Sequence, residues 1–169
     1  AEYNGAEKAS HVKDKLIEMT HLNETLYCCG IACSAEGTET ASGNYLIDLM
    51  LANVCKQNVT RFPYEIARLA QDIAGGLMVT LPSEKDINHS VAGAYIKKYF
   101  AGTATTSVEN RFKIMRLIEN LTLGTAAVGY LTESLHGAGS PQAQRIMISR
   151  QSNMPAKKAM AKHIAHIKD

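Results

Sequence analysis

The chain has 169 residues, of which 46% are hydrophobic and 20% are charged, and its formal net charge is +2. These values are ordinary for a globular protein, and a domain of this size buries enough apolar surface to need no disulfides. The basic residues are spread along the chain, which argues against a nucleic-acid partner. No apolar run approaches the roughly 20 residues that cross a bilayer, and the chain begins without a basic or apolar leader. We therefore expect a cytoplasmic protein without a membrane segment.

Apolar residues recur at three- and four-residue steps through most of the chain, which is the period of an α-helix. The pattern predicts a first long helix over residues 6–35 and a second over 44–75. Pro63 should kink or split the second helix, because proline lacks the backbone donor that a helix interior needs. The pair Gly75–Gly76 should end it, and an extended piece is predicted over 77–82.

The second half of the chain continues the helical pattern. A short helix is predicted over 92–100, and Ser107 should open a longer one, because its hydroxyl can accept from the free amides of a first turn. That helix is expected to continue to His136. Two last amphipathic helices are predicted over 141–149 and 155–167, the first of them opening on a proline.

No convincing alternating pattern of a β-strand is present. The predicted fold class is therefore all-α, an up-down helical bundle formed by a single domain over residues 1–169.

The four cysteines are Cys28, Cys29, Cys33 and Cys55, and three of them fall in one predicted helix. Thiolates so close together could bind zinc or an iron–sulfur cluster. On a helix, however, Cys29 and Cys33 share a face while Cys28 points about 100° away. We favour small core residues over metal ligands, and we expect neither a disulfide framework nor a metal site in this chain.

Two Glu-x-x-His motifs, Glu18 with His21 and Glu133 with His136, offer a second candidate chemistry. In di-iron four-helix bundles such pairs place a carboxylate and an imidazole on one helical face, together with further carboxylates from the other helices. No obvious inward carboxylate lies near Cys55 to complete the set. A di-iron bundle stays open as an alternative.

Two further features could carry chemistry. The segment Gln71–Gly76 ends in paired glycines, which let backbone amides approach a phosphate or the edge of a ring, although a glycine that only ends a helix fits the spacing equally well. Glu133 lies in a run of small and apolar residues, where an ionised carboxylate costs free energy unless it is paired. It is either a group for proton transfer or a solvated side chain.

Four longer runs together go beyond composition and resemble the C-terminal region of the 4-hydroxybutyryl-CoA dehydratase family. That family also isomerises vinylacetyl-CoA, is related to the flavin-dependent 4-hydroxyphenylacetate 3-monooxygenases, and is similar in fold to the acyl-CoA dehydrogenases. The resemblance covers essentially all of this chain and only the last third of a family protein. The runs are Ala9–Leu16, Asn53–Pro63, Asp72–Gly76 and His136–Gln142.

The resemblance implies that the full enzyme is a homotetramer with FAD and a four-iron four-sulfur cluster, and that it works in an oxygen-sensitive fermentative pathway. The cluster ligands, the flavin-binding β-domain and an N-terminal helical domain would lie outside this chain. The reaction would remove water from 4-hydroxybutyryl-CoA to give crotonyl-CoA. Two alternatives are a fragment of a flavin-dependent aromatic monooxygenase of the same family and a purely structural oligomerisation module.

The resemblance also assigns site residues. Glu133 matches the position of a family active-site glutamate proposed for acid–base work, and His136, one helical turn on, could orient or share that proton or could pack in the core. Gln71, Gly75 and Gly76 resemble a segment that reaches the FAD of a neighbouring subunit in acyl-CoA dehydrogenase-like tetramers. In that segment Ala74 and Leu77 depart from the usual residues.

Overall fold

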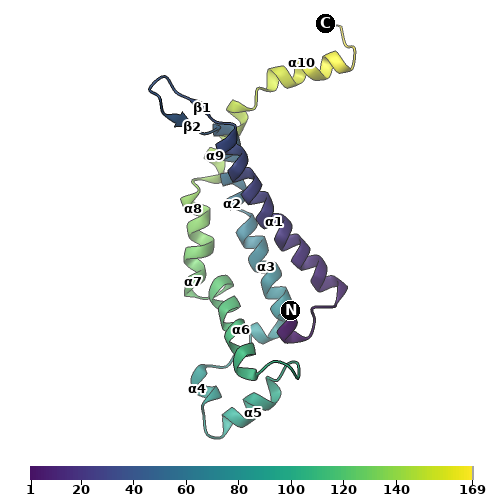
Figure 1. The fold of residues 1–169 in the computed structure, drawn as a ribbon, viewed down its shortest axis with the longest axis vertical. Helices are drawn as coiled ribbons and strands as arrows, with labels where there is room; N and C mark the ends of the chain where they lie inside the picture. The colour runs from purple at the N-terminus through teal and green to yellow at the C-terminus, as the bar shows by residue number, and fades with distance from the viewer. Residues whose placement is uncertain (169) are drawn as a thin grey trace. The chain divides into compact units, whose positions relative to one another are not determined.

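The structure is a computed structural model, and it describes residues 1–168. It is helical apart from one short hairpin (Figure 1), which confirms the predicted all-α class. The chain divides into two compact units, which we describe separately. Unit 1 contains residues 1–22 and 62–133, and unit 2 contains residues 23–61 and the segment from Ser134 onward. Within residues 1–168, no helix is both long and apolar enough to cross a membrane.

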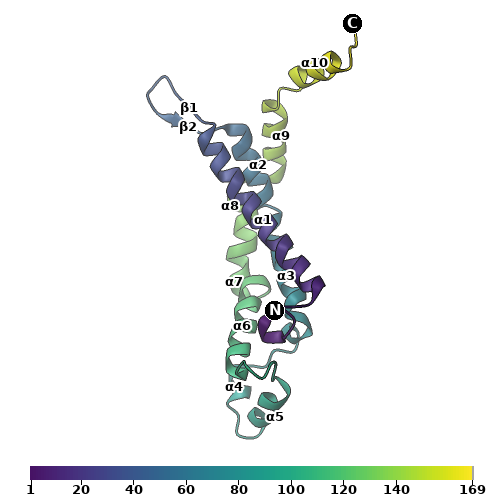
Figure 2. The ribbon, with the colours of Figure 1, turned by 45° about the vertical axis from the view of Figure 1, so that its right-hand side comes forward.

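Unit 1 is built around α3 and α6, which lie side by side (Figures 1 and 2). The long helix α1 (Ser10–Ala35) contributes its first half to this unit and its second half to unit 2. The remaining elements of unit 1 are short pieces around this pair. In chain order unit 1 contains η1 (Glu2–Asn4), α3 (Phe62–Ala74), η2 (Gly75–Met78), α4 (Glu84–Ile87), α5 (Ala92–Tyr99), α6 (Val108–Thr122), α7 (Thr125–Ala127) and η3 (Val128–Thr132).

Two small apolar clusters form the core of unit 1. One contains Ala74, Met78 and Met115, and so joins the end of α3 and η2 to α6. The other contains Ile87, Phe100 and Phe112 and joins α4 and the end of α5 to the start of α6. The ring centroids of Phe100 and Phe112 lie 6.3 Å apart, and the ring planes are tilted by 59°. This is a favourable geometry for an aromatic pair. The first cluster therefore fixes the end of α3 against α6, and the second fixes α4 and α5 against the start of α6.

Local signals fix several helix starts in unit 1. The Ser107 hydroxyl accepts from the Asn110 amide, so the predicted cap of α6 is confirmed. Gly93 lets α5 approach the end of α4 closely, because a Cβ at Gly93 would lie 2.3 Å from the Ile87 carbonyl oxygen.

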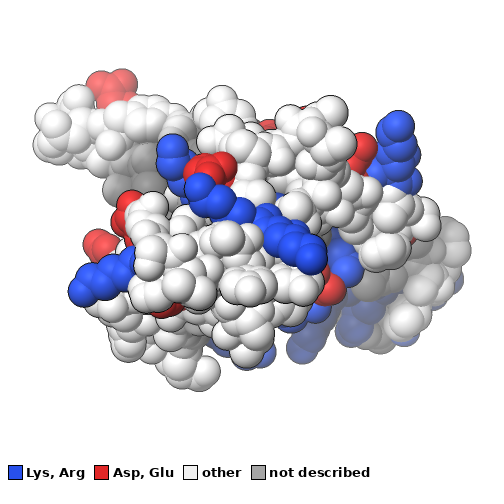
Figure 3. All heavy atoms as spheres, turned by 90° about the horizontal axis from the view of Figure 1, so that it is seen from below, with Lys and Arg blue, Asp and Glu red and all other residues white. Residues whose placement is uncertain are grey.

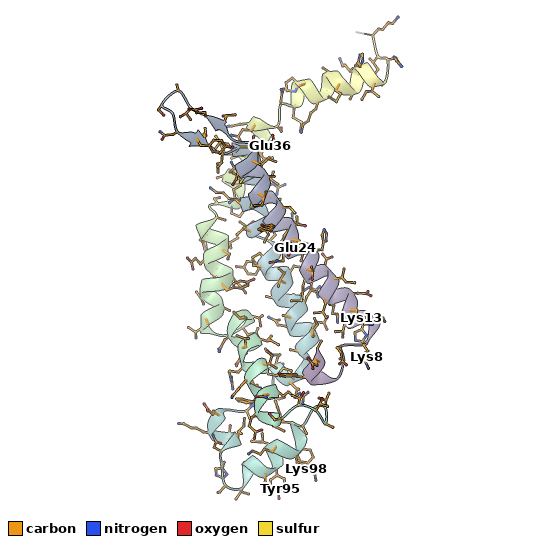
Figure 4. All side chains as sticks on the ribbon, in the orientation of Figure 1. Lys8, Lys13, Glu24, Glu36, Tyr95 and Lys98 are labelled. Atoms are coloured by element: carbon orange, nitrogen blue, oxygen red, sulfur yellow. The ribbon has the colours of Figure 1, made fainter. Side chains whose placement is uncertain are left out.

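The outer side of α5 presents Tyr95 to solvent, as Figure 4 shows. On the face in Figure 3, acidic and basic side chains lie among uncharged ones.

Unit 2 is built on the packing of α2 against α9. The Asp48 carboxylate caps α2 by accepting from the Leu51 amide at 2.7 Å. A hairpin of two strands, each of two residues, precedes α2, and in it Thr38 pairs with Leu46. Unit 2 contains β1 (Thr38–Glu39), β2 (Tyr45–Leu46), α2 (Leu49–Val59), α8 (Glu133–Gly137) after its first residue, α9 (Pro141–Gln151) and α10 (Met154–Ile164).

The structure corrects three predicted boundaries. The helix predicted from residue 44 begins at Leu49, because the preceding residues form the hairpin. The extended segment was predicted to begin directly after Gly76, and this is wrong because the 3₁₀ helix η2 continues to Met78. The long helix from Ser107 to His136 is interrupted after Thr122, at the cap residue Leu123. The predicted break at Pro63 is confirmed, since this residue sits in the first turn of α3.

Candidate functional site

The end of α3 places Gln71 and the glycine pair next to one another. The Gln71 side-chain amide donates to the Thr122 carbonyl at 3.2 Å, which ties the last turn of α3 to the end of α6. Gly75 has φ +73°, a left-handed conformation that favours glycine. Both glycines are exposed, and a Cβ at either would meet nothing within 4 Å. The backbone here is open to an approaching ligand.

A buried arginine, missed by the sequence analysis, holds this segment in place. Arg111 is 9% exposed and donates from Nη1 to the Phe100 carbonyl at 2.7 Å. Its Nε and Nη2 donate to Asn4 Oδ1 at 3.1 and 2.8 Å. Asn4 Nδ2 in turn donates to the Ile73 carbonyl at 3.2 Å, at the end of α3. Arg111 thus reaches the end of α3 through Asn4.

The charge of Arg111 is compensated without a carboxylate. Burial lowers the pKa of the Arg111 guanidinium, which still stays protonated in proteins. Its hydrogen-bond partner Asn4 contacts carbonyls at the C-terminal, partially negative end of α3, which suits a cation nearby. The sequence did hold one signal, because Arg111 precedes the buried Met115 by four residues and so falls on the apolar stripe of α6.

A cavity of about 280 Å³ lies beside this network. Its lining combines η1 with the end of α3 and with apolar side chains of α6, including Ile114, Met115 and Ile118. Gln71, Gly75 and Gly76 do not line it. The cavity and the glycine pair are therefore separate features of the same helix end.

Glu133 follows a π-helical turn, η3 (Val128–Thr132), and is the first residue of α8. A π turn carries one residue more than an α turn and rotates the helix beyond it, and such turns are frequent at functional sites. The turn packs against α3. The Glu133 Oε2 atom lies 3.9 Å from the position of a Cβ on Gly129. No pattern in the sequence indicated this π turn.

Residues 1–168 alone do not enclose the Glu133 carboxylate in a dry pocket. The side chain is exposed, and within residues 1–168 its carboxylate has no ion-pair or hydrogen-bond partner. His136 is also exposed, so it does not pack in a core formed by residues 1–168. The Glu133 carboxylate is therefore open to a ligand or to protein outside residues 1–168.

The cysteines have the predicted character of core residues only in part. All four are free, with Cys33 buried, Cys29 and Cys55 half-buried and Cys28 exposed. Burial, followed by the nearby Cys29 and Cys33, raises the pKa of the Cys55 thiol. Within residues 1–168, no group of three or more His, Cys, Asp or Glu is placed to hold a metal ion.

The di-iron alternative is also not supported by the geometry. His21 Nδ1 lies 3.5 Å from Glu18 Oε2, but both side chains are largely exposed. No third ligand joins them in the part of the chain that the structure describes.

Two carboxylates on α3 are paired with cations. Asp72 Oδ2 lies 2.8 Å from Lys15 Nζ, and Glu65 accepts from Arg68 Nη2 and Nε at 2.7 and 2.8 Å. The hydrogen bonds from Lys15 and Arg68 lower the pKa of the Asp72 and Glu65 carboxyls below their ordinary values of 3.8 and 4.5. The stability from these pairs is therefore complete above the ordinary values and is lost as the pH falls through the lowered ones.

We expect the melting temperature of the chain to fall as the pH drops below about 4.5, by loss of these pairs among other carboxylates. In the double variant Glu65→Gln/Asp72→Asn the melting temperature should fall less steeply with decreasing pH. Because all four side chains are partly exposed, the change at neutral pH should be small. Thermal melts followed by circular dichroism between pH 7 and pH 2 measure both slopes, and equal slopes in the two proteins would contradict the assignment.

Comparison with known proteins assigns the chain to a family. The family model described as 4-hydroxyphenylacetate 3-hydroxylase C terminal matches residues 1–166. The chain is 67% identical to 4-hydroxybutyryl-CoA dehydratase/vinylacetyl-CoA-Δ-isomerase of Clostridium aminobutyricum, over 99% of this chain and 36% of that protein. The chain thus spans about a third of the length of this relative.

Solved structures agree with this result. An oxygen-tolerant archaeal 4-hydroxybutyryl-CoA dehydratase from N. maritimus matches with a TM-score of 0.94 and 66% identity, over 100% of this chain and 34% of that one. The oxygenase component of 4-hydroxyphenylacetate 3-monooxygenase, in complex with FAD and 4-hydroxyphenylacetate, matches with a TM-score of 0.85 and 23% identity, over 98% and 35%. The second match shows a shared fold. The chain belongs to the 4-hydroxyphenylacetate 3-hydroxylase C-terminal family.

Proposed function

We propose that this chain is the C-terminal domain of a FAD- and iron–sulfur-dependent dehydratase, which removes water from 4-hydroxybutyryl-CoA to give crotonyl-CoA and also isomerises vinylacetyl-CoA. The observation that carries the proposal is the 67% identity, along nearly the whole chain, to a dehydratase/isomerase of that name. Because the chain spans about a third of that relative, we assign the reaction to the complete enzyme. We further propose that this enzyme is a cytoplasmic homotetramer.

Glu133 is the group of this chain that we assign to proton transfer. Its carboxylate is exposed and has no partner within residues 1–168, so it is free to meet a substrate at the surface that this chain presents. The π turn before it sets the direction in which it projects. A closed site formed with the rest of the enzyme would exclude water around it and strengthen its interactions. His136 would orient the carboxylate or share its proton.

The open backbone at Gly75 and Gly76 fits the edge of a flavin. Neither glycine has a neighbour within 4 Å of its Cβ position, so a ring or a phosphate can come close to the main chain. We propose that these glycines and Gln71 complete the FAD site of a neighbouring subunit, with Asn4 and Arg111 fixing the end of α3. FAD, when bound, supplies the one-electron chemistry that makes an unactivated C–H bond acidic.

An iron–sulfur cluster does not fit this chain. Within residues 1–168, the cysteines and histidines form no group that could hold a metal ion. A cluster in the complete enzyme would therefore need ligands from other segments, and we assign it no residue here.

An anaerobic assay tests the proposal directly. The complete enzyme should convert 4-hydroxybutyryl-CoA to crotonyl-CoA, whereas the 169-residue chain with added FAD should show no enzymatic turnover, because it lacks most of the site. Detection of thioesters by chromatography measures both. The proposal fails if the complete enzyme instead hydroxylates an aromatic substrate with reduced flavin and oxygen. That outcome would favour an aromatic monooxygenase, to which the shared fold alone also points.

A further inference from the structure

The last part of the chain carries an unbalanced positive charge. Residues 134–169 contain six Lys and Arg residues and one acidic residue, the terminal Asp169, whereas the whole chain contains 18 basic and 16 acidic residues. Within residues 23–61 and 134–168, the acidic residues of unit 2 lie on the second half of α1, on the hairpin or at the start of α2, with Glu24 and Glu36 on and just beyond α1 (Figure 4).

A groove of about 730 Å³ in unit 2 gathers three of the cations of this unit. Arg61 follows the end of α2, Arg145 lies on α9, and Lys157 lies in the first turn of α10. The packing of α2 against α9 brings the two arginines to one groove. Asn153, in a left-handed conformation with φ 45°, caps α10 by accepting from the Ala156 amide.

The groove has the polar groups of an anion site. None of the described carboxylates lines it. All three cations are exposed, and within residues 1–168 none of them has an ion-pair or hydrogen-bond partner through its side chain. The Gln57 Oε1 atom is buried in the lining and has no hydrogen-bond partner in the described chain. Hydroxyl groups of Ser149 and Ser152 complete the polar lining.

These groups match a phosphorylated nucleoside better than a bare phosphate. The planar guanidinium of arginine binds phosphate oxygens through two parallel hydrogen bonds, which suits Arg61 and Arg145. The apolar side chains of Ile148 and Met154 also line the groove, and they offer a surface on which a base and a ribose can pack. The volume of the groove falls in the usual range of ligand sites, about 300–1,000 Å³.

We propose that the groove between α2, α9 and α10 binds an adenosine diphosphate moiety. The inference rests on the proposed function for the source of the ligand, because the acyl-CoA substrate and FAD both contain this moiety. The groove would hold the end of the molecule that takes no part in the reaction. The groove therefore contributes to the affinity for that molecule, and the chemical step does not depend on the groove.

Charge reversal at Arg145 in the complete enzyme tests the proposal. Arg145→Glu should raise either the KM for 4-hydroxybutyryl-CoA or the Kd for FAD at least tenfold and leave the other constant nearly unchanged. The constant that rises identifies the source. Because the interaction is between exposed charges, the difference should shrink as the ionic strength rises. Arg145→Gln, which keeps a side chain of similar size, should show a smaller change in the same constant.

Arg150→Glu is the matched control, because Arg150 is exposed on the same helix and does not line the groove. Inorganic diphosphate serves as a probe independent of turnover. It should bind the unmodified enzyme and the control alike, as measured by calorimetry, and bind Arg145→Glu at least tenfold more weakly.

Two results would overturn the proposal. One is that both constants and diphosphate binding in Arg145→Glu stay within twofold of the Arg150→Glu control. The other is that Arg145→Glu dissociates the assembly in size-exclusion chromatography, which would show that the cations meet acidic groups of another protein segment. If the complete enzyme shows no dehydratase activity but the diphosphate result holds, the proposed function fails and the anion groove remains.

Discussion

Replacement of Glu133 by Gln in the complete enzyme should lower kcat by about 10²- to 10⁴-fold, which is the usual contribution of a general acid or base. The KM for the acyl-CoA substrate should change little, because the variant removes proton transfer and keeps the size and polarity of the side chain. Within residues 1–168 the carboxylate has no ion-pair or hydrogen-bond partner to lose. The folded structure should therefore be preserved, and anaerobic kinetics would measure both constants.

The matched control is Glu18→Gln. Glu18 is an exposed glutamate that also precedes a histidine by three residues, and its replacement should leave kcat within about twofold. A Glu133→Gln enzyme with normal kcat would contradict the assignment and would favour a purely structural role for this chain. A rise in KM with kcat unchanged would place Glu133 in substrate binding only.

Replacement of Arg111 by Met should lower the free energy of unfolding of the chain by about 2–4 kcal/mol. The change removes three hydrogen bonds and leaves the Phe100 carbonyl and the Asn4 side-chain oxygen without their donors, and each unsatisfied buried group costs about 1–3 kcal/mol. Relief of the desolvation of the guanidinium offsets part of this loss. Urea unfolding followed by circular dichroism measures the difference.

Two variants separate the charge of Arg111 from its geometry. Arg111→Lys keeps the cation but lacks the planar fork, so its stability should fall between those of the wild type and Arg111→Met. The control Arg150→Met, on an exposed position of α9, should stay within about 0.5 kcal/mol of the wild type. If Arg111→Met and the wild type are equally stable, the hydrogen bonds of Arg111 only offset the free-energy cost of burying its guanidinium charge.

Local sequence determined where most helices begin and end. Ser107 and Pro141 start α6 and α9 because a capping hydroxyl and an N-terminal proline act within one turn. Pro63 separates α2 from α3 for a similarly local reason. Helical periodicity also gave the fold class. The assignment of Glu133 came from the resemblance to a family, since its spacing alone left a solvated carboxylate equally possible.

Only the tertiary structure decided the surroundings of the candidate groups. Arg111 and Asn4 are 107 residues apart, and no local pattern joins them. The groove of Arg61, Arg145 and Lys157 exists because α2 packs against α9.

The exposure of Glu133 has the same explanation. Its neighbours in sequence are small and apolar, which left a buried and a solvated carboxylate equally possible, because burial depends on which segments pack over a surface. Short-range hydrogen bonds and steric limits depend on a few consecutive residues. Packing between distant helices sets the burial, pairing and direction of each side chain. The elements could therefore be predicted from this sequence, and the site they form could not.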